Sequence, residues 1–162
     1  MICDGMSPIE IKGPREFSAE DYARMIALLE QGREVDLASA RQELPKCPGI
    51  AVLRDAGEIV AMCALKRVRS SYVASISKKS GYALTDAPEV GYVVTDCRWQ
   101  GRGCGRTVCT AMLQQAEGPL FATVREGNEG MIRILQANGF HQKGRCWPSD
   151  LRLGMSIGLW IR

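Results

Sequence analysis

The six residues Gln100-Gly101-Arg102-Gly103-Cys104-Gly105 join two segments of different periodicity. Before them, the apolar and β-branched run 89–95 predicts a strand. After them, a helix to about residue 117 is predicted by the spacing of Val108, Ala111, Met112 and Gln115. The stretch is therefore a glycine-rich loop between a strand and a helix, and an α/β fold is predicted around it.

A loop of this kind offers an anion two things, converging backbone N–H groups and the positive end of a helix. Its glycines permit positive φ and a close approach of the backbone, and Arg102 and Arg106 add charge. A nucleoside-triphosphatase loop is excluded, because Gly105 is followed by Arg106-Thr107 and not by Gly-Lys-Ser/Thr. A dinucleotide fingerprint also fails, because Arg106 stands where its third glycine is required. The loop taken alone fits a glycine-rich turn without a ligand equally well.

The residues before the loop predict a strand, two helices and a hairpin, at 9–12, 18–32, 36–44 and 50–65. Ser18 is a predicted N-cap with Asp21 three residues on, an approximate capping box. Residues 55–58 form the predicted tight turn of the hairpin. The Ser- and Lys-rich segment 67–86 predicts irregular structure that includes a surface loop.

The residues after the loop predict a strand at 119–124 and a helix that begins at the N-cap Asn128 and ends at Asn138-Gly139. Apolar residues then alternate from Leu151 to Ile161, which predicts a half-buried strand. Elements of this order form an α/β domain around a mixed sheet. No linker or repeat interrupts the 162 residues, so we expect one domain, 1–162.

The loop fits the pattern Gln/Arg-x-x-Gly-x-Gly/Ala, and the chain resembles the GCN5-related N-acetyltransferase (GNAT) superfamily. Glu89 lies eleven residues before Gln100, where the histone-acetyltransferase branch places a general base. Asn128, followed by a helix that ends in Asn138-Gly139-Phe140, resembles a second family segment. The likeness is clearest over residues 48–145. It implies a GNAT-type acyl-CoA N-acyltransferase fold, a single domain whose mixed β-sheet is flanked by helices, and an acetyl-CoA-dependent N-acetyltransferase.

The resemblance also implies how acetyl-CoA is held. The backbone of Val93 and Val94 would bind the pantetheine arm, with the Val93 N–H near the thioester carbonyl. The diphosphate would be received by the N–H groups of Gly101, Arg102, Gly103, Cys104, Gly105 and Arg106. Asn128 would reach the CoA, although a role as N-cap fits it equally. For both valines a place in the core of a strand is the alternative, and it is compatible with backbone binding.

Glu89 is the catalytic residue that the resemblance implies. It would take a proton from an amine, which then attacks the thioester directly in a ternary complex. A solvated edge-strand acid, or one paired with a basic residue, is the alternative. Leu135 stands where the family carries its tyrosine general acid, so the proton donor is not identified. A non-catalytic CoA-binding sensor or scaffold of the same fold therefore stays the alternative function.

The composition limits the classes of partner and the compartment that we expect for the chain. A net charge of +3 is too small to argue for nucleic acid binding, so a nucleic acid partner is not expected. No apolar run approaches the roughly 20 residues that span a bilayer, so no membrane is expected either. The seven cysteines lack metal-ligand spacing, the only histidine is His141, and no signal peptide is evident. We therefore expect no metal and a cytoplasmic protein with free thiols. The acceptor is expected to be a small-molecule or peptide amine, and a homodimer through the C-terminal strand is possible.

Overall fold

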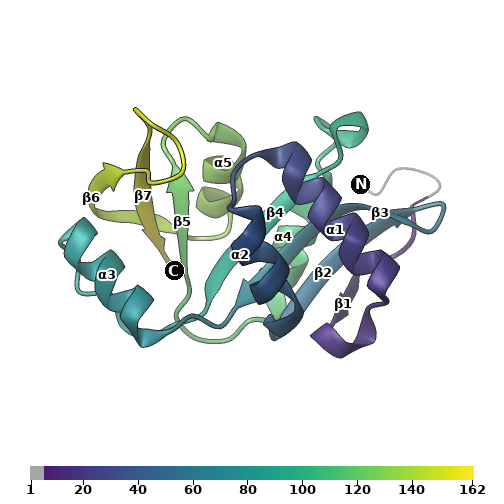
Figure 1. The fold of residues 1–162 in the computed structure, drawn as a ribbon, viewed down its shortest axis with the longest axis horizontal. Coiled ribbons are helices and arrows are strands. Elements are labelled where there is room, and N and C mark those ends of the chain that lie inside the picture. Colours follow the sequence, from purple (N-terminus) through teal and green to yellow (C-terminus); the bar gives the residue numbers. More distant parts are fainter. Residues whose placement is uncertain (1–5) are drawn as a thin grey trace. The chain divides into compact units, whose positions relative to one another are not determined.

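The computed structural model describes residues 6–162 (Figure 1). Its strands are β1 (Glu10–Lys12), β2 (Gly49–Asp55), β3 (Glu58–Lys66), β4 (Glu89–Thr95), β5 (Phe121–Arg125), β6 (His141–Pro148) and β7 (Ser156–Ile161). Its α-helices are α1 (Ala19–Gly32), α2 (Leu37–Glu43), α3 (Ser70–Ser80), α4 (Cys104–Gln115) and α5 (Glu129–Ala137). Three short 3₁₀ turns complete the order: η1 (Pro14–Glu16), η2 (Leu44–Lys46) and η3 (Cys97–Trp99).

The strands hydrogen-bond in the order β1-β2-β3-β4-β5-β7-β6. The β4–β5 pair is parallel, whereas β1–β2, β2–β3, β5–β7 and β6–β7 are antiparallel, so the sheet is mixed. This confirms the predicted α/β fold class. The chain divides into two compact units. The first unit holds the described residues up to 66 and residues 92–116, and the second holds 67–91 and 117–162. β4 thus begins in the second unit and ends in the first.

In the first unit, helices cover both faces of β2 and β3. Buried residues of α1, among them Met25 and Leu28, share one core with Ile50 of β2 and Met62 of β3. The other face of these strands meets α4, whose Cys109 contacts Cys63 of β3. Both strands are consequently apolar along nearly their whole length, as expected for strands buried on two sides.

In the second unit, α3 packs on β6 and β7. Its buried Val73 and Ile76 lie on one helical face, and Ile76 shares a small core with Phe121 of β5 and Leu159 of β7. The helix ends at Gly81, whose φ of 70° is the left-handed conformation that terminates helices readily. No described helix has both the length and the apolar character needed to cross a membrane.

Several local predictions are confirmed. Ser18 and Asp21 form the capping box at the start of α1, and the 55–58 turn closes the β2–β3 hairpin with Ala56 and Gly57 at positive φ. Asn128 caps α5, because its side chain accepts a hydrogen bond from the Met131 N–H at 3.3 Å.

Two predictions are wrong in part. The irregular structure predicted for 67–86 is contradicted over residues 70–80, which form α3, whereas the rest of the segment forms neither helix nor strand. The apolar stripe of α3 packs on the sheet and outweighs the low helix propensity of its serines. The C-terminal strand covers only Ser156–Ile161. Residues 151–155 instead form a turn with Gly154 at φ 78°, in which Leu153 is fully exposed, because alternation alone supplies no partner strand.

Candidate functional site

The loop 100–105 runs into the N-terminus of α4, as predicted. Gly101 and Gly103 both adopt positive φ, 76° and 79°, and a Cβ built on either would meet nothing within 4 Å. Gly103 is the N-cap of α4, so no side chain caps the first N–H groups of the helix. The first intrahelical bond runs from the Thr107 N–H to the Gly103 carbonyl at 2.9 Å, and the Thr107 hydroxyl donates to the same oxygen. The donors of the first turn therefore lie beside an open, exposed loop.

The loop carries two exposed cations, Arg102 and Arg106. The Arg102 guanidinium lies 4.6 Å from the centre of the Trp99 ring, a cation–π contact that orients it. Cys104 is only 3% exposed and faces the interior, and Gly105 is half-buried. The chemistry of the loop is thus that of backbone donors and two positive charges, which fits a diphosphate.

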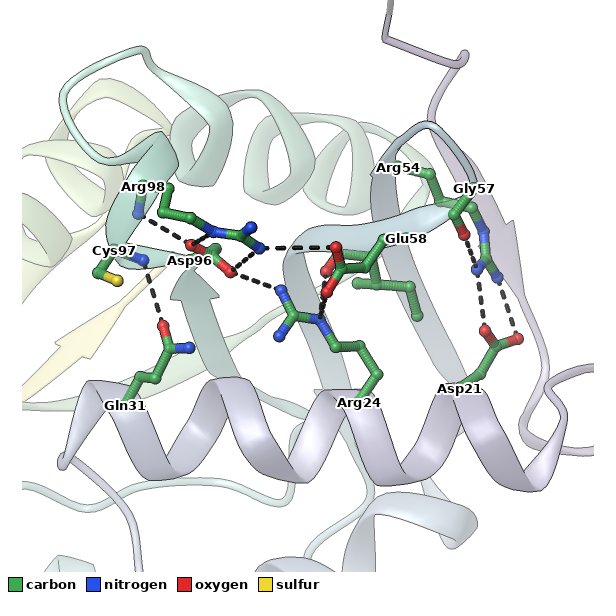
Figure 2. A network of polar contacts seen from close by, with 10 residues as sticks. Asp21, Arg24, Gln31, Arg54, Gly57, Glu58, Asp96, Cys97 and Arg98 are labelled. Carbon is green, nitrogen blue, oxygen red and sulfur yellow. Dashed lines mark hydrogen bonds and ion pairs between the residues drawn. The ribbon is translucent and has the colours of Figure 1, made fainter.

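A charged network fastens the start of this loop to the rest of the first unit (Figure 2). Asp96, the residue that follows β4, is 1% exposed and accepts hydrogen bonds from the guanidinium groups of Arg24 of α1 and Arg98. The Arg98 N–H donates to the same carboxylate at 2.8 Å, and the Arg24 Nε lies 3.1 Å from a carboxylate oxygen of Glu58. Hydrogen bonds from Arg98, with further ones from Arg24, hold the pKa of Asp96 well below its usual range.

A second charged cluster in the same unit joins α1 to the β2–β3 hairpin. Arg54 of β2 donates to both carboxylate oxygens of Asp21, at 2.8 and 3.0 Å, and to Glu10 at 2.9 Å. The hydrogen bonds from Arg54 lower the pKa of Asp21. Together the two clusters fix α1 along β3 and the end of β4, and so position the loop that follows β4 (Figure 2).

Glu89, the predicted base, is the first residue of β4 and is 3% exposed. Its Oε1 accepts a hydrogen bond from the Thr123 hydroxyl of β5 at 3.0 Å and from the Tyr72 hydroxyl of α3 at 3.4 Å. Its backbone pairs with Phe121 in the parallel β4–β5 ladder. The alternative of a solvated edge-strand acid is therefore wrong. Thr123 and Tyr72 were not predicted from the sequence to lie beside this carboxylate.

The middle of β4 is irregular. Tyr92 has a φ of 51°, a left-handed conformation that a non-glycine residue in a strand adopts only under strain. Its ring lies under the Lys66 ammonium at 4.6 Å and packs in the core of the first unit, as does Val94. Val93 is half-buried. The core-strand interpretation thus holds for Val94, and binding of a pantetheine arm by the backbone of Val93 and Val94 stays a prediction.

The remaining predicted residues divide between capping and packing. Asn128 is half-buried and acts as the N-cap of α5, and its contact with CoA stays a prediction. Leu135, where the family carries a tyrosine, is fully buried and belongs to the core. The loop with Val93 and Val94 lies in the first unit, whereas Glu89 and Asn128 lie in the second.

The described cysteines are free thiols, and Cys104 and Cys109 are both buried. A hydrogen bond to Cys109, together with burial, raises the pKa of Cys63 well above its usual range. A thiol with a raised pKa is a poor nucleophile, so Cys63 is suited to packing between β3 and α4. Among residues 6–162, no cluster of three His, Cys, Asp or Glu side chains could hold a metal ion.

Comparison with known proteins gives one family. The model of the acetyltransferase (GNAT) domain matches residues 12–141. A GNAT-family acetyltransferase from Streptococcus agalactiae superposes with a TM-score of 0.71 at 14% identity, covering 95% of this chain and 94% of that one. A ribosomal-protein-alanine N-acetyltransferase from Brucella melitensis gives 0.67 at 18% identity, with 94% and 98% covered. YncA of Salmonella typhimurium, solved with its cofactor acetyl-CoA, gives 0.66 at 17% identity, with 96% and 94% covered. No curated protein matches the chain by sequence.

Proposed function

The chain belongs to the GNAT acetyltransferase family, and from this premise we propose that it transfers an acetyl group from acetyl-CoA to an amine. The amine attacks the thioester directly while both substrates are bound. One observation carries the proposal: the loop 100–105 presents two left-handed glycines and a helix start without a side-chain cap. Backbone N–H groups in this arrangement suit the diphosphate of CoA.

Each predicted residue has one task in this mechanism. The N–H groups of residues 101–106 hold the diphosphate, and the guanidinium groups of Arg102 and Arg106 add positive charge. The backbone of Val93 and Val94 holds the pantetheine arm, and the Val93 N–H stabilises the oxyanion that forms on the thioester carbonyl. Asn128 uses its Oδ1 to cap α5, and it contacts the CoA through the remaining polar atoms of its side chain.

Glu89 acts as the base. An alkylamine has a free pKa of about 10.4 and is protonated at neutral pH, so it must lose a proton before it attacks. The thiol of CoA, with a pKa of about 8.5, is a good leaving group and can depart without a general acid. Leu135 is buried and cannot donate a proton, but the departure of CoA as a thiolate does not require one.

The acceptor class that we propose is a small-molecule or peptide amine, and the compartment is the cytoplasm, where the free cysteines stay reduced. A homodimer stays a prediction, but we do not propose that it forms by pairing of the C-terminal strand with a second copy. β7 lies between β5 and β6 and so has no free edge for a second copy. A surface other than that strand is required.

Calorimetry with acetyl-CoA tests the loop. Gly103→Asp forces a side chain into positive φ and places a negative charge among the phosphate donors, so binding should weaken by about 100-fold or more. Gly118→Asp is the matched control, because Gly118 has φ 77°, equally open surroundings and lies outside the loop. Equal binding by the two variants would remove the loop from the site.

Release of CoA thiol across a panel of amines, with an amine-free blank for the protein's own thiols, tests the catalysis. Glu89→Gln should keep the affinity for acetyl-CoA and lower kcat by about 10²–10⁴-fold, the usual range for loss of a general base. Unchanged kcat would take Glu89 out of the mechanism. Tight binding without thiol release on any amine would instead favour the non-catalytic CoA sensor of the same fold.

A further inference from the structure

Glu89 is poorly placed to receive a proton from a solvent-borne amine without help, because its side chain is 3% exposed. Its Oε1 does, however, accept hydrogen bonds from two hydroxyl groups, those of Thr123 at 3.0 Å and Tyr72 at 3.4 Å. The two differ in access, since Thr123 is half-buried in the sheet whereas Tyr72 is 40% exposed on α3. Tyr72 therefore connects the buried carboxylate to the surface of the second unit.

We infer that Tyr72 is a second catalytic residue, which passes the proton of the acceptor amine to Glu89. The inference rests on the proposed function and adds to it the residue that meets the amine. It assigns this task to α3, the helix that the sequence did not predict.

The phenol has the right chemistry for a relay. A tyrosine hydroxyl both donates and accepts a hydrogen bond, so it can take one proton while giving up another. The free pKa values of a phenol and an alkylammonium are close, about 10 and about 10.4, so transfer between them is nearly balanced. Threonine, whose hydroxyl is far less acidic, fits the other task, which is to orient Oε1.

The step balances without any further reactant. The ammonium N–H bond breaks and its proton bonds to the Tyr72 oxygen, while the Tyr72 O–H bond breaks and that proton bonds to Glu89 Oε1. The freed lone pair attacks the thioester carbonyl carbon, and the C–S bond breaks as the amide forms. The second amine proton leaves with the CoA sulfur, and Glu89 returns its proton to solvent through Tyr72.

The second unit holds Tyr72 in place. The Arg145 guanidinium of β6 donates to the carbonyls of Lys79 and Lys78, at 3.1 and 3.3 Å, and so satisfies the last carbonyls of α3. Gly144, at φ 68°, lets β6 approach so closely that a Cβ there would lie 2.4 Å from the Ser80 carbonyl oxygen. The helix that carries Tyr72 is thereby fixed at its C-terminal end.

The test compares Tyr72→Phe with Tyr82→Phe, using the best acceptor of the amine panel and a β-fluorinated analogue of it. The fluorine makes the amino group less basic, so less of it needs deprotonation at neutral pH. Tyr72→Phe should lower kcat by about 10–100-fold on the parent amine, well within the range of acid–base catalysis, and clearly less on the fluorinated one. Its affinity for acetyl-CoA should not change. Tyr82 is partly buried against the apolar core of the same unit, so Tyr82→Phe should leave both kcat values unchanged.

Two results would overturn the relay. One is an unchanged kcat in Tyr72→Phe, and the other is an equal loss on both amines with a raised KM for the amine, which would make Tyr72 a binding residue. Thermal melting checks that each variant folds. Thr123→Val is a second variant for comparison. Because Thr123 only orients Oε1, its removal should lower kcat on both amines to the same extent, whatever their basicity. If the wild-type chain transfers acetyl to no amine while it binds acetyl-CoA, the proposed function itself fails and the relay with it.

Discussion

The two ends of β4 are held in different ways. Its C-terminal end, in the first unit, leads into Asp96, whose buried carboxylate lies between two guanidinium groups. Its N-terminal end, in the second unit, begins with Glu89, whose buried carboxylate accepts hydrogen bonds from two neutral hydroxyls. Both acids are almost inaccessible to solvent, at 1% and 3% exposed. Their partners therefore decide what each one does.

A carboxylate between two arginines is stabilised as an anion and gives up its charge only with difficulty. Such a group suits a structural task, here the anchoring of the loop that follows β4. The Glu89 carboxylate instead accepts hydrogen bonds from two hydroxyl groups, and a hydroxyl can both donate and accept a proton. Under the proposed function, Asp96 supports the binding loop and Glu89 takes part in catalysis. Variants at the two ends should change different measurements.

The largest effect is expected from Asp96→Asn. The change keeps the size of the side chain but removes the charge that compensates Arg24, which is itself only 19% exposed. The free energy of unfolding should fall by about 3 kcal/mol, the lower part of the range for breaking a buried ion pair, because Arg98 is largely exposed. Urea unfolding measures the loss, and calorimetry should show weaker acetyl-CoA binding as the loop loosens.

Glu129→Gln is the control for that substitution. It also removes a carboxylate from an arginine, since Glu129 lies 2.9 Å from Arg133, but both side chains are exposed and lie four residues apart on α5. Its effect should stay within about 0.5 kcal/mol. Equal losses in the two variants would mean that the Asp96 network does not anchor the first unit.

A smaller effect is expected at the other end from Gly144→Ala. The new methyl group would meet the Ser80 carbonyl oxygen at 2.4 Å, so the end of α3 must shift. Overpacking of this kind costs about 2 kcal/mol and should displace Tyr72. We expect a lower kcat with unchanged affinity for acetyl-CoA, measured by thiol release and calorimetry.

Gly154→Ala separates the clash from backbone strain. Gly154 has a similar φ of 78° but open space around it, so alanine there should cost about 1 kcal/mol from strain alone and leave kcat unchanged. A Gly144→Ala variant with normal kcat would show that the position of α3 does not matter for turnover. That result would also weaken the distinction between the two ends of β4.

The loop end of β4 was largely predictable from sequence, because its determinants are local. Gly101 and Gly103 mark positive φ, and the change of periodicity across the loop marks the start of α4. The capping box at Ser18 and the hairpin turn at 55–58 are local in the same sense. Their outcome depends on residues within a few positions, so the sequence pattern carries it.

The Glu89 end was not predictable in the same way. Tyr72 and Thr123 lie 17 and 34 residues from Glu89 in the chain, and only packing brings them to one oxygen. One partner of Asp96 is more distant still, since Arg24 lies 72 residues away in the chain. One signal was present: Val73, Ile76 and Ser80 lie on one helical face, and this spacing indicates a packed helix in a Ser-rich segment.

The smallest effect is the response of the first unit to acid. The pKa of Asp96 is lower in the folded protein than the value of about 3.9 in an unfolded chain, so folding favours the ionised form. Its contribution to stability is therefore complete above about pH 4 and is lost as the pH falls toward the folded pKa, at up to about 1.4 kcal/mol per pH unit. Asp21, Asp36 and Glu10 have lowered pKa values too, and they act in the same direction.

Urea unfolding at pH 7, 4 and 3 should thus show the wild type losing stability faster than Asp96→Asn, so that the gap in unfolding free energy between them closes toward pH 3. A gap that stays constant would show that the charge of Asp96 does not hold the loop end of β4, and the contrast with Glu89 would then rest on hydrogen bonding alone.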